Sequence, residues 1–287
     1  MRLIKPSYKI IEQEPGINGV YKMIEYAGRI CYKSSNKITE DSAKPFVDRM
    51  IKSGHGAMLE HGTIYLVIPM TTYAPEAVNI YRHSPYSKVN ECNKFIFTDK
   101  YGDKAAAWCV TTNLRVLVEN DCLEDLEFLC EPTEYHERRI TVHFVCDRGV
   151  SHEFVRHRVF SFAQESTRYC NYSKDKFDNE LTFIQPCWLD DERLKLYRPY
   201  HTVIRDKSPE SIFIANLNNT EKDYIDLIKS GWKAQEARNI LPLSLKTELI
   251  MTGFNSDWQH FFELRCAPNA HPQAKELADM LKDKLNK

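Results

Sequence analysis

Near the N-terminus, the order of hydrophobic and polar residues predicts both helices and strands. Alternation over Tyr8–Glu12 predicts a strand, and apolar residues at helical spacing predict a helix over Gly16–Ile30. A second helix is expected over about Glu40–Lys52, ended by Ser53–Gly54, since glycine commonly closes a helix. The apolar, β-branched run Ile64–Ile68 predicts a strand that is buried on both faces.

The segment over residues 70–138 has a less regular pattern and contains no motif that we can connect with chemistry. We expect two short strands, Phe95–Thr98 and Trp108–Thr112, on either side of the polar loop Lys100–Asp103. Two helical segments, Leu114–Glu119 and Leu123–Cys130, are expected after them. We interpret this segment as an elaboration of a more regular fold.

The second half of the chain has clearer patterns. They predict a strand at Ile140–Cys146, a helix at Asp147–Val155, a long amphipathic helix from Ser208 to about Lys229, a short helix at Ala234–Ile240, a strand at Lys246–Gly253 and a closing helix at Pro272–Lys284. No internal repeat, low-complexity tract or Gly/Ser linker divides them. We therefore expect an α+β fold in a single interwoven domain over residues 1–287, with a central sheet flanked by long helices.

Composition and charge narrow the functional classes. The net charge is −1 and the pI is about 6.8, whereas a non-specific nucleic-acid binder needs a basic balance. The N-terminus has no apolar leader, and no apolar run approaches about eighteen residues. The nine cysteines are scattered without a Cys-x-x-Cys pair, which indicates reduced thiols and no structural zinc. We expect a cytoplasmic protein that binds no membrane and no nucleic acid.

The segment Arg156–Ser173, called the arginine segment below, has the most informative composition. It contains Arg156, Arg158 and Arg168 together with a histidine and many hydroxyl and amide side chains. Arginine binds phosphate through two parallel hydrogen bonds and stacks on flat rings, so the segment predicts a phosphorylated, aromatic ligand such as a nucleotide. The alternative is a solvated face or an ion-pair network with nearby acids.

The spacing within the arginine segment favours a ligand site. Arg156-His157-Arg158 is followed, after seven residues, by Ser166 and then by Arg168-Tyr169, so that six positions are fixed within fourteen. This pattern resembles the signature of the flavin-dependent thymidylate synthases. The resemblance covers about residues 17–69 and 139–285, and it makes about 70–138 an insertion that diverges from the family.

A second motif, Gly54-His55-Gly56-Ala57-Met58-Leu59-Glu60-His61, precedes the predicted strand at Ile64. Histidine and glutamate can bind zinc, but the two histidines are six residues apart across a glycine, so we expect no metal site. A histidine that fixes the loop is the structural alternative. The stretch resembles a loop that lies near the flavin in the same family, which implies cofactor contacts at His55 and Ala57, without a hydroxyl at Ala57.

Two further stretches resemble motifs of the family. Glu236–Pro242 is similar to Ala-Arg-x-x-Leu-Pro, which implies that Arg238 contacts the nucleotide, whereas a surface ion pair is the structural alternative. Thr252–Arg265 is similar to a segment whose histidine touches the flavin and whose arginine meets the pyrimidine ring. These residues are His260 and Arg265 here, and the aromatic residues beside them are expected in the core.

Two side chains, Ser166 and Cys187, could instead act as nucleophiles. Ser166 and His157 could act as a nucleophile and its base, but no adjacent acid or nucleophile-elbow glycine accompanies them. Cys187 lies in Pro-Cys-Trp, which resembles the Pro-Cys-His of flavin-independent thymidylate synthases with its histidine replaced. We interpret Ser166 as a hydrogen-bonding ligand residue and Cys187 as structural.

The resemblance implies reductive methylation of dUMP to dTMP without a cysteine nucleophile. It implies FAD as cofactor, NADPH as reductant, methylenetetrahydrofolate as carbon donor, and a homotetramer with FAD at the subunit interfaces. Hydride transfer requires a cofactor, and a cation that stabilises negative charge on the uracil ring can activate C5, so Arg265 is the catalytic candidate. The implied cofactor-binding residues are Arg156, His157, Arg158, Gln164, Asn255, His260, Ala57 and His55. The implied substrate-binding residues are Glu153, Arg156, Gln164, Glu165, Ser166, Thr167, Arg168, Arg238 and Arg265.

Two other functions use the same residues. One is a different flavoprotein that acts on a pyrimidine nucleotide, and the other is an RNA- or DNA-binding protein that uses Arg156–Arg168. Bound flavin favours an enzyme, whereas salt-sensitive retention of oligonucleotides without a chromophore favours nucleic-acid binding.

Overall fold

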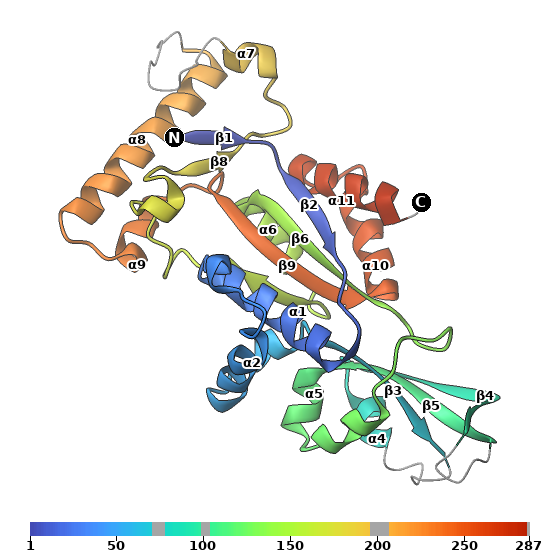
Figure 1. The fold of residues 1–287 in the computed structure, drawn as a ribbon. Coiled ribbons are helices and arrows are strands. Elements are labelled where there is room, and N and C mark those ends of the chain that lie inside the picture. The colour runs from blue at the N-terminus through green and yellow to red at the C-terminus, as the bar shows by residue number, and fades with distance from the viewer. Residues whose placement is uncertain (71–77, 99–103, 196–206, 286–287) are drawn as a thin grey trace.

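The computed structural model describes residues 1–70, 78–98, 104–195 and 207–285, and it combines helices and sheets as an α+β fold requires (Figure 1). The strands are β1 (Arg2–Ile4), β2 (Ser7–Ile11), β3 (Thr63–Pro69), β4 (Lys88–Thr98), β5 (Lys104–Asn113), β6 (Arg139–Asp147), β7 (Ser161–Gln164), β8 (Thr182–Ile184) and β9 (Lys246–Phe254). The α-helices are α1 (Gly16–Cys31), α2 (Ala43–Lys52), α3 (Gly56–Leu59), α4 (Asn79–His83), α5 (Leu114–Glu119), α6 (Arg148–Phe154), α7 (Asp191–Lys195), α8 (Pro209–Lys229), α9 (Ala234–Ala237), α10 (Asn255–Arg265) and α11 (Pro272–Leu285). The short 3₁₀ helices include η3 (Leu123–Phe128) and η5 (Arg238–Ile240).

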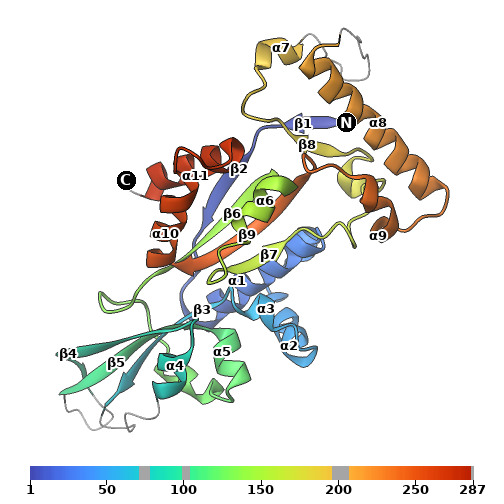
Figure 2. The same cartoon turned by 180° about the vertical axis from the view of Figure 1, so that it is seen from behind.

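The central sheet consists of four antiparallel strands in the order β2-β6-β9-β7. Successive side chains of a strand point to opposite faces. Phe144 of β6 and Met251 of β9 pack against Trp258 of α10, whereas Ile250 packs against Ala27 of α1. Helices therefore cover both faces, with α10 and α11 on one and α1 on the other (Figures 1 and 2).

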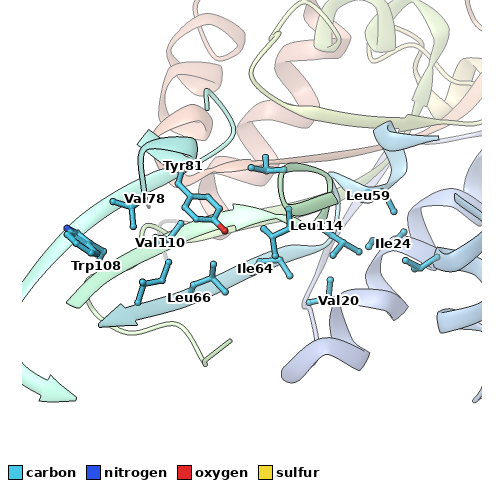
Figure 3. Packing of buried hydrophobic residues seen from close by; sticks show 14 of the residues in the cluster. Val20, Ile24, Leu59, Ile64, Leu66, Val78, Tyr81, Trp108, Val110 and Leu114 are labelled. Carbon is cyan, nitrogen blue, oxygen red and sulfur yellow. The ribbon is translucent and has the colours of Figure 1, made fainter. Parts of the chain in front are cut away.

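A second sheet, β3-β5-β4, contains much of the segment that we interpret as an insertion. Ile64 and Leu66 of β3 are fully buried with Val110 of β5 and Leu114 of α5 (Figure 3). The same cluster includes Ile24 of α1. The second sheet therefore packs on the helix that also covers the central sheet, and the prediction that β3 is buried on both faces is confirmed.

The third part of the fold is a parallel pair, β1-β8, which lies beside the long helix α8 (Figure 1). Ser208 caps α8 by accepting a hydrogen bond from the Ser211 amide over 3.1 Å, as its position before Pro209 predicts. Leu217 and Tyr224 of α8 are buried in a separate apolar cluster. The same cluster includes Tyr172 of the arginine segment and Ala237 of α9.

Most of the predicted elements are confirmed with ends within a few residues: β2, α1, α2, β3, α5, β6, α6, α8, β9 and α11. Leu123–Cys130 differs, because its helical part is a 3₁₀ helix and Leu129 then forms a bridge with Leu66 of β3. The Gly54–His61 stretch, expected as a loop, includes α3. The predicted loop Lys100–Asp103 lies outside the described residues.

Two elements of the central fold were not predicted. The strand β7 lies within the polar arginine segment and pairs over only four residues, from Ser161 to Gln164. The helix α10 was not predicted because its sequence mixes polar and aromatic residues without a clear apolar face. Its buried residues are Trp258, Phe261 and Phe262. Among the described residues, which include all nine cysteines, there is no disulfide bond. Within the described ranges, no helix has the length and apolar character that a membrane span requires.

Candidate active site

Arg265, the last residue of α10, joins α10 to α6 and to the arginine segment. Its Nη1 donates to Oε2 of Glu153 over 2.6 Å, and its Nη2 donates to the Glu153 carbonyl oxygen over 2.5 Å. Its Nε donates to Nε2 of His157 over 3.0 Å. With 14% of its side chain exposed, the guanidinium is fixed by a carboxylate, a main-chain oxygen and an imidazole while one edge still reaches solvent.

His157 is buried beside this guanidinium. Burial, with a smaller contribution from the charge of Arg265, lowers the pKa of His157 to about 4. The imidazole is therefore neutral near pH 7, and its Nε2 accepts the hydrogen bond from Arg265 because its own proton lies on Nδ1. Phe261 and Phe160 surround the ring, with centroids 5.0 and 6.2 Å away. The packing fixes the orientation of His157 as well as its charge state.

Arg156, Arg158 and Arg168 are exposed on the same segment. Arg156 donates from Nε to the carbonyl oxygen of His152 over 3.3 Å. In the part of the chain that the structure describes, none of the three arginines forms an ion pair with a carboxylate. This finding argues against an internal ion-pair network and leaves three cations that can bind an anion.

The turn that follows β7, Gln164–Arg168, is held from several sides. Gln164 donates from Nε2 to Oγ of Ser151 over 2.8 Å, and the Ser166 amide donates to the Cys31 carbonyl at the end of α1 over 3.1 Å. The hydroxyl of Ser166 accepts from the Arg168 amide over 3.3 Å. Thr167 is buried. The turn is thus an ordered platform, and its ligand contacts remain predictions.

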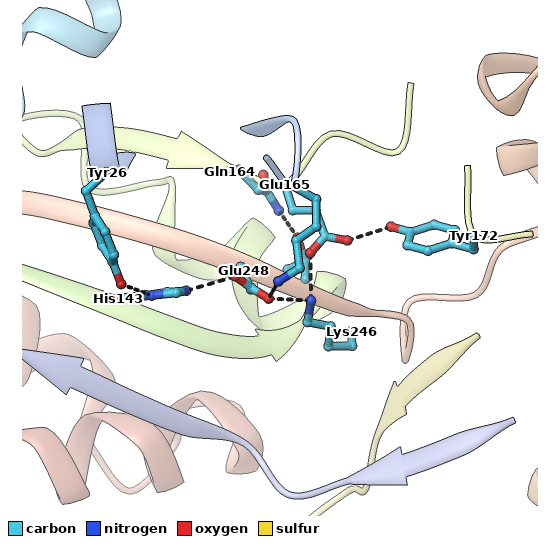
Figure 4. A network of polar contacts seen from close by, with 9 residues as sticks. Tyr26, His143, Gln164, Glu165, Tyr172, Lys246 and Glu248 are labelled. Atoms are coloured by element: carbon cyan, nitrogen blue, oxygen red, sulfur yellow. Dashed lines mark hydrogen bonds and ion pairs between the residues drawn. The ribbon is translucent and has the colours of Figure 1, made fainter. Parts of the chain in front are cut away.

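Glu165 differs from the other predicted ligand residues in this turn. Its side chain is 1% exposed, with Oε2 2.6 Å from Nζ of Lys246 and Oε1 accepting from the hydroxyl of Tyr172 over 2.9 Å (Figure 4). The carboxylate therefore faces the interior. A contact between Glu165 and a ligand would have to use its main chain.

Arg168 and Arg238 are brought towards the same region. Arg168 lies over the ring of Tyr169, 5.2 Å from its centroid, and its Nε donates to Oε1 of Gln235 over 3.4 Å. Gln235 belongs to α9, which continues directly into η5, where Arg238 is exposed. The structure thus places two predicted phosphate-binding arginines on adjoining elements.

His55 and Ala57 line a hollow of about 460 Å³ at the start of α3. Tyr32 and Arg115 contribute to the same lining. The Tyr32 ring also contacts Tyr169, with centroids 5.1 Å apart. The hollow therefore adjoins the face that carries Arg168 and Tyr169, and Tyr32 and Arg115 are contributors that the motifs did not reveal.

Asn255 lies apart from these residues, whereas His260 lies beside His157. Asn255 lines a larger cavity of about 790 Å³, together with Tyr65 of β3 and Arg139 of β6. His260 is exposed on α10, 6.4 Å from the His157 ring, and its Nδ1 lies 3.3 Å from a carboxylate oxygen of Glu263. Within one chain, the predicted cofactor residues therefore lie at different places, with Asn255 on the larger cavity, His55 and Ala57 on the hollow, and His260 beside His157.

A polar network on the α1 face of the central sheet was also not predicted. It includes Tyr26, His143, Lys246 and Glu248 (Figure 4). The signal was available, since Lys246 and Glu248 stand two residues apart at the start of an otherwise apolar strand. Two charges at that spacing share one face of the sheet. Among the described residues there is no group of three or more metal-ligating side chains suited to a metal ion.

Comparison with known proteins identifies the family. The profile of the family described as "Thymidylate synthase complementing protein" matches residues 133–287, more than half of the chain. The chain belongs to this family. The match confirms the family resemblance that was drawn from the arginine segment.

Curated relatives of this thymidylate synthase complementing protein family have the same description, flavin-dependent thymidylate synthase. The protein from Pyrococcus furiosus is 30% identical over 142 residues, which cover 50% of this chain and 52% of the relative. The protein from Geobacter sulfurreducens is 28% identical over 131 residues, covering 46% and 49%. The chain spans about half the length of the curated relatives it matches.

The family match includes the arginine segment, Arg238 and Arg265, and it begins after the second sheet. It therefore covers the guanidinium cluster around Arg265. The hollow at His55 and Ala57 lies outside the matched residues.

Proposed function

We propose that the protein is a flavin-dependent thymidylate synthase that converts dUMP to dTMP, with FAD as cofactor, NADPH as reductant and methylenetetrahydrofolate as carbon donor. The observation that carries this proposal is the fixed guanidinium of Arg265. It lies against a neutral His157 and close to arginines that have no carboxylate partner among the described residues. Such a cluster fits a nucleotide that has both a phosphate and an electron-accepting ring.

In this proposal, Arg265 stabilises the negative charge that develops on the pyrimidine ring when C5 becomes nucleophilic. Its contribution is electrostatic, because a guanidinium keeps its proton at all working pH values. Glu153 and His157 orient it, and preorganised donors of this kind need no reorganisation during the reaction. The acid Glu153 is paired with Arg265, so it does not oppose a nearby phosphate as an unpaired carboxylate would.

The nucleotide phosphate is assigned to Arg168 and Arg238, which lie on adjoining elements. Gln164, the last residue of β7, and Ser166, which follows the strand, supply hydrogen-bonding groups beside Arg168. Arginine binds phosphate with a planar fork of donors, which suits this role better than a lysine would.

The remaining predicted residues are assigned to FAD: Arg156, His157, Arg158, His260, Asn255, His55 and Ala57. When bound, flavin supplies the hydride chemistry that no side chain can perform. The exposed cations Arg156 and Arg158 fit the phosphates of such a cofactor.

The predicted cofactor residues are dispersed over the chain, which supports an assembly of several copies, and we include a homotetramer in the proposal. Asn255 and the hollow at His55 lie on separate cavities, and an assembly in which different chains contribute them would bring both sets to one FAD molecule. Exposed apolar side chains flank the arginine cluster, including Val155, Val159 and Leu264. Apolar residues beside a charged site are typical of an interface that is covered in the assembly.

The test is a visible absorption spectrum of the purified protein, recorded before and after anaerobic NADPH, with and without dUMP. Flavin bands near about 375 and 450 nm that bleach with NADPH are expected from a hydride-transferring flavoprotein. Faster bleaching with dUMP would connect the flavin to the nucleotide. A colourless protein that stays free of flavin after FAD is added would overturn the proposal, and salt-sensitive oligonucleotide binding would then favour the nucleic-acid alternative.

A further inference from the structure

The polar network on the α1 face of the central sheet joins two carboxylates, Glu165 and Glu248, to the ammonium groups of Lys246 and Lys33 (Figure 4). Nζ of Lys246 lies 2.6 Å from Oε2 of Glu165 and 2.7 Å from Oε1 of Glu248. Lys33 forms a second ion pair with Glu248. Lys246 and its two carboxylate partners are nearly inaccessible, with side-chain exposures of 13% for Lys246, 1% for Glu165 and 8% for Glu248.

Tyrosine and histidine side chains extend the network at both ends. Tyr172 donates from its hydroxyl to Glu165 over 2.9 Å. His143 lies with Nε2 3.2 Å from Glu248 and with Nδ1 2.7 Å from the hydroxyl of Tyr26. Burial opposes both pKa shifts, but the hydrogen bond with His143 and the charges of Lys246 and Lys33 lower the pKa of Glu248, and Glu165 and Glu248 raise the pKa of Lys246. Glu248 and Lys246 are therefore both charged.

This network meets the candidate nucleotide site at Glu165. The neighbouring Gln164 points to the α6 side of the sheet, where it donates to Ser151, whereas Glu165 points to the α1 side. Lys246 begins β9 directly after the chain that carries Arg238. The Glu165–Lys246 pair thus ties the turn with Ser166 and Arg168 to the strand that follows Arg238.

We infer that Lys246 is a positioning residue, which holds the Gln164–Arg168 turn in the geometry that binds the nucleotide phosphate. This inference rests on the proposed function, because the turn is assigned to dUMP there. Lys246 itself touches no ligand in this assignment. It acts through Glu165, whose main chain separates the two predicted ligand residues Gln164 and Ser166.

The buried ion pairs of Lys246 indicate that the network fixes the geometry of the turn more than it stabilises the fold. A buried ion pair can often be replaced by apolar residues of similar volume without loss of stability, whereas removing one partner leaves an uncompensated charge. An ion pair differs from an apolar contact in its direction and its fixed distance. It therefore suits a turn whose outward residues must match a ligand closely.

The test compares dUMP affinity, flavin content and thermal midpoint in FAD-loaded protein. Lys246→Met is expected to weaken dUMP binding about tenfold or more, as small displacements of positioning groups do, with bound FAD unchanged. Lys246→Arg, which keeps the charge, should recover most of the affinity. Binding is measured by calorimetry with dUMP as the titrant.

A double variant guards against simple unfolding of Lys246→Met. In Glu165→Gln with Lys246→Met, no lone charge remains at Glu165, and Glu248 keeps its ion pair with Lys33. This variant should fold and still bind dUMP weakly. Affinity equal to that of the unmodified protein in either variant would overturn the positioning role.

Glu25→Gln is the matched control. Glu25 is 1% exposed and pairs with Arg29 over 2.7 Å within α1, so the substitution also breaks a buried ion pair. It should lower the thermal midpoint and leave dUMP affinity unchanged, and an equal loss of affinity would show general destabilisation and overturn the inference. Failure of the proposed function gives a different result, because the unmodified protein itself would then bind no dUMP.

Discussion

Arg265 donates a hydrogen bond from Nε to Nε2 of His157 over 3.0 Å, so a permanent cation is joined to a neutral imidazole. This geometry requires an unprotonated Nε2, and the charge of Arg265 in turn disfavours a second proton on His157. The histidine of the Arg-His-Arg motif, His157, therefore adds no charge near pH 7. It keeps the cation of Arg265 oriented without competing with it for an anion.

Replacing Arg265 should separate catalysis from cofactor binding. We expect Arg265→Ala to retain FAD and to lower the rate of dTMP formation by about 10²-fold or more, because a preorganised charge is lost where negative charge develops. Arg265→Lys should recover little, since one ammonium group cannot reproduce the fork that contacts both Glu153 and His157. The measurements are single-turnover dTMP formation and flavin absorbance.

An exposed arginine provides the control for this substitution. Arg2 pairs with Asp178 and Glu180 near the N-terminus, away from α10. Arg2→Ala should leave both the rate and the flavin content unchanged. Full activity in Arg265→Ala would remove Arg265 from the mechanism.

Arg168 should act on nucleotide affinity through the phosphate. Arg168→Lys keeps the charge but loses the planar fork, and hydrogen bonds to charged groups are worth about 1.5–3 kcal/mol, so we expect dUMP to bind about tenfold or more weakly. Arg238→Lys should have a similar effect. The comparison ligand is deoxyuridine, which has no phosphate. If Arg168→Lys weakened deoxyuridine and dUMP equally, the phosphate assignment would be wrong.

Two buried histidines predict that the protein loses stability in mild acid. Burial lowers the pKa of His61 to about 3, and burial with Arg265 lowers the pKa of His157 to about 4. An unfolded histidine has a pKa of about 6.5, so below that pH the unfolded chain binds protons that the folded chain does not. Their contribution is therefore complete above about pH 6.5 and is lost as the pH falls, by at most about 1.4 kcal/mol per pH unit for each histidine.

This acid sensitivity can be measured by urea unfolding between about pH 7 and 4.5, the range in which unfolded histidines titrate. His61→Gln should flatten the pH dependence, because glutamine cannot be protonated. His83→Gln is the control, since His83 is exposed on α4. The lowered pKa of Glu248 affects a different range, below about pH 4.5, where an unfolded carboxylate titrates. An unchanged slope in His61→Gln would contradict the role of His61.

The spacing of hydrophobic residues was sufficient to predict the helices and strands in which apolar residues recur with the period of one kind of element. The helix α1 is an example because it buries one continuous face, and the strand β9 is another because it is buried on both faces. The strand β7 escaped prediction because its pairing depends on β9, which is about 85 residues away in sequence. The pairing of strands and the placement of the second sheet against α1 are long-range contacts that no local pattern contains.

The candidate site was predictable as residue types but not as an arrangement. Arg265 and His157 both appeared in motifs, yet their contact depends on α10 and α6 packing on the same face of the central sheet. Glu165 was predicted as a ligand residue from its place in the arginine segment, and its inward orientation became visible only with Lys246 beside it. Neighbours in sequence can face opposite sides of a strand.

Gly253 of β9 offers a test of the packing that supports His157. An added Cβ would lie 2.5 Å from Cδ1 of Phe160, and the Phe160 ring is itself buried between Trp258 and His157, at centroid distances of 4.7 and 6.2 Å. These neighbouring rings restrict how far the Phe160 ring can shift. We expect Gly253→Ala to cost about 1–3 kcal/mol of unfolding free energy, as overpacking of a filled core does.

The second consequence of Gly253→Ala is functional. A displaced Phe160 ring presses on His157, so the orientation of Arg265 should suffer and dTMP formation should slow while flavin remains bound. Urea unfolding and single-turnover rates measure the two effects. Adding Phe160→Leu to Gly253→Ala should recover part of the loss, because a smaller side chain removes the clash, and the two substitutions would then be non-additive. Additive effects, or a Gly253→Ala variant as stable as the original protein, would show that the ring does not transmit the contact.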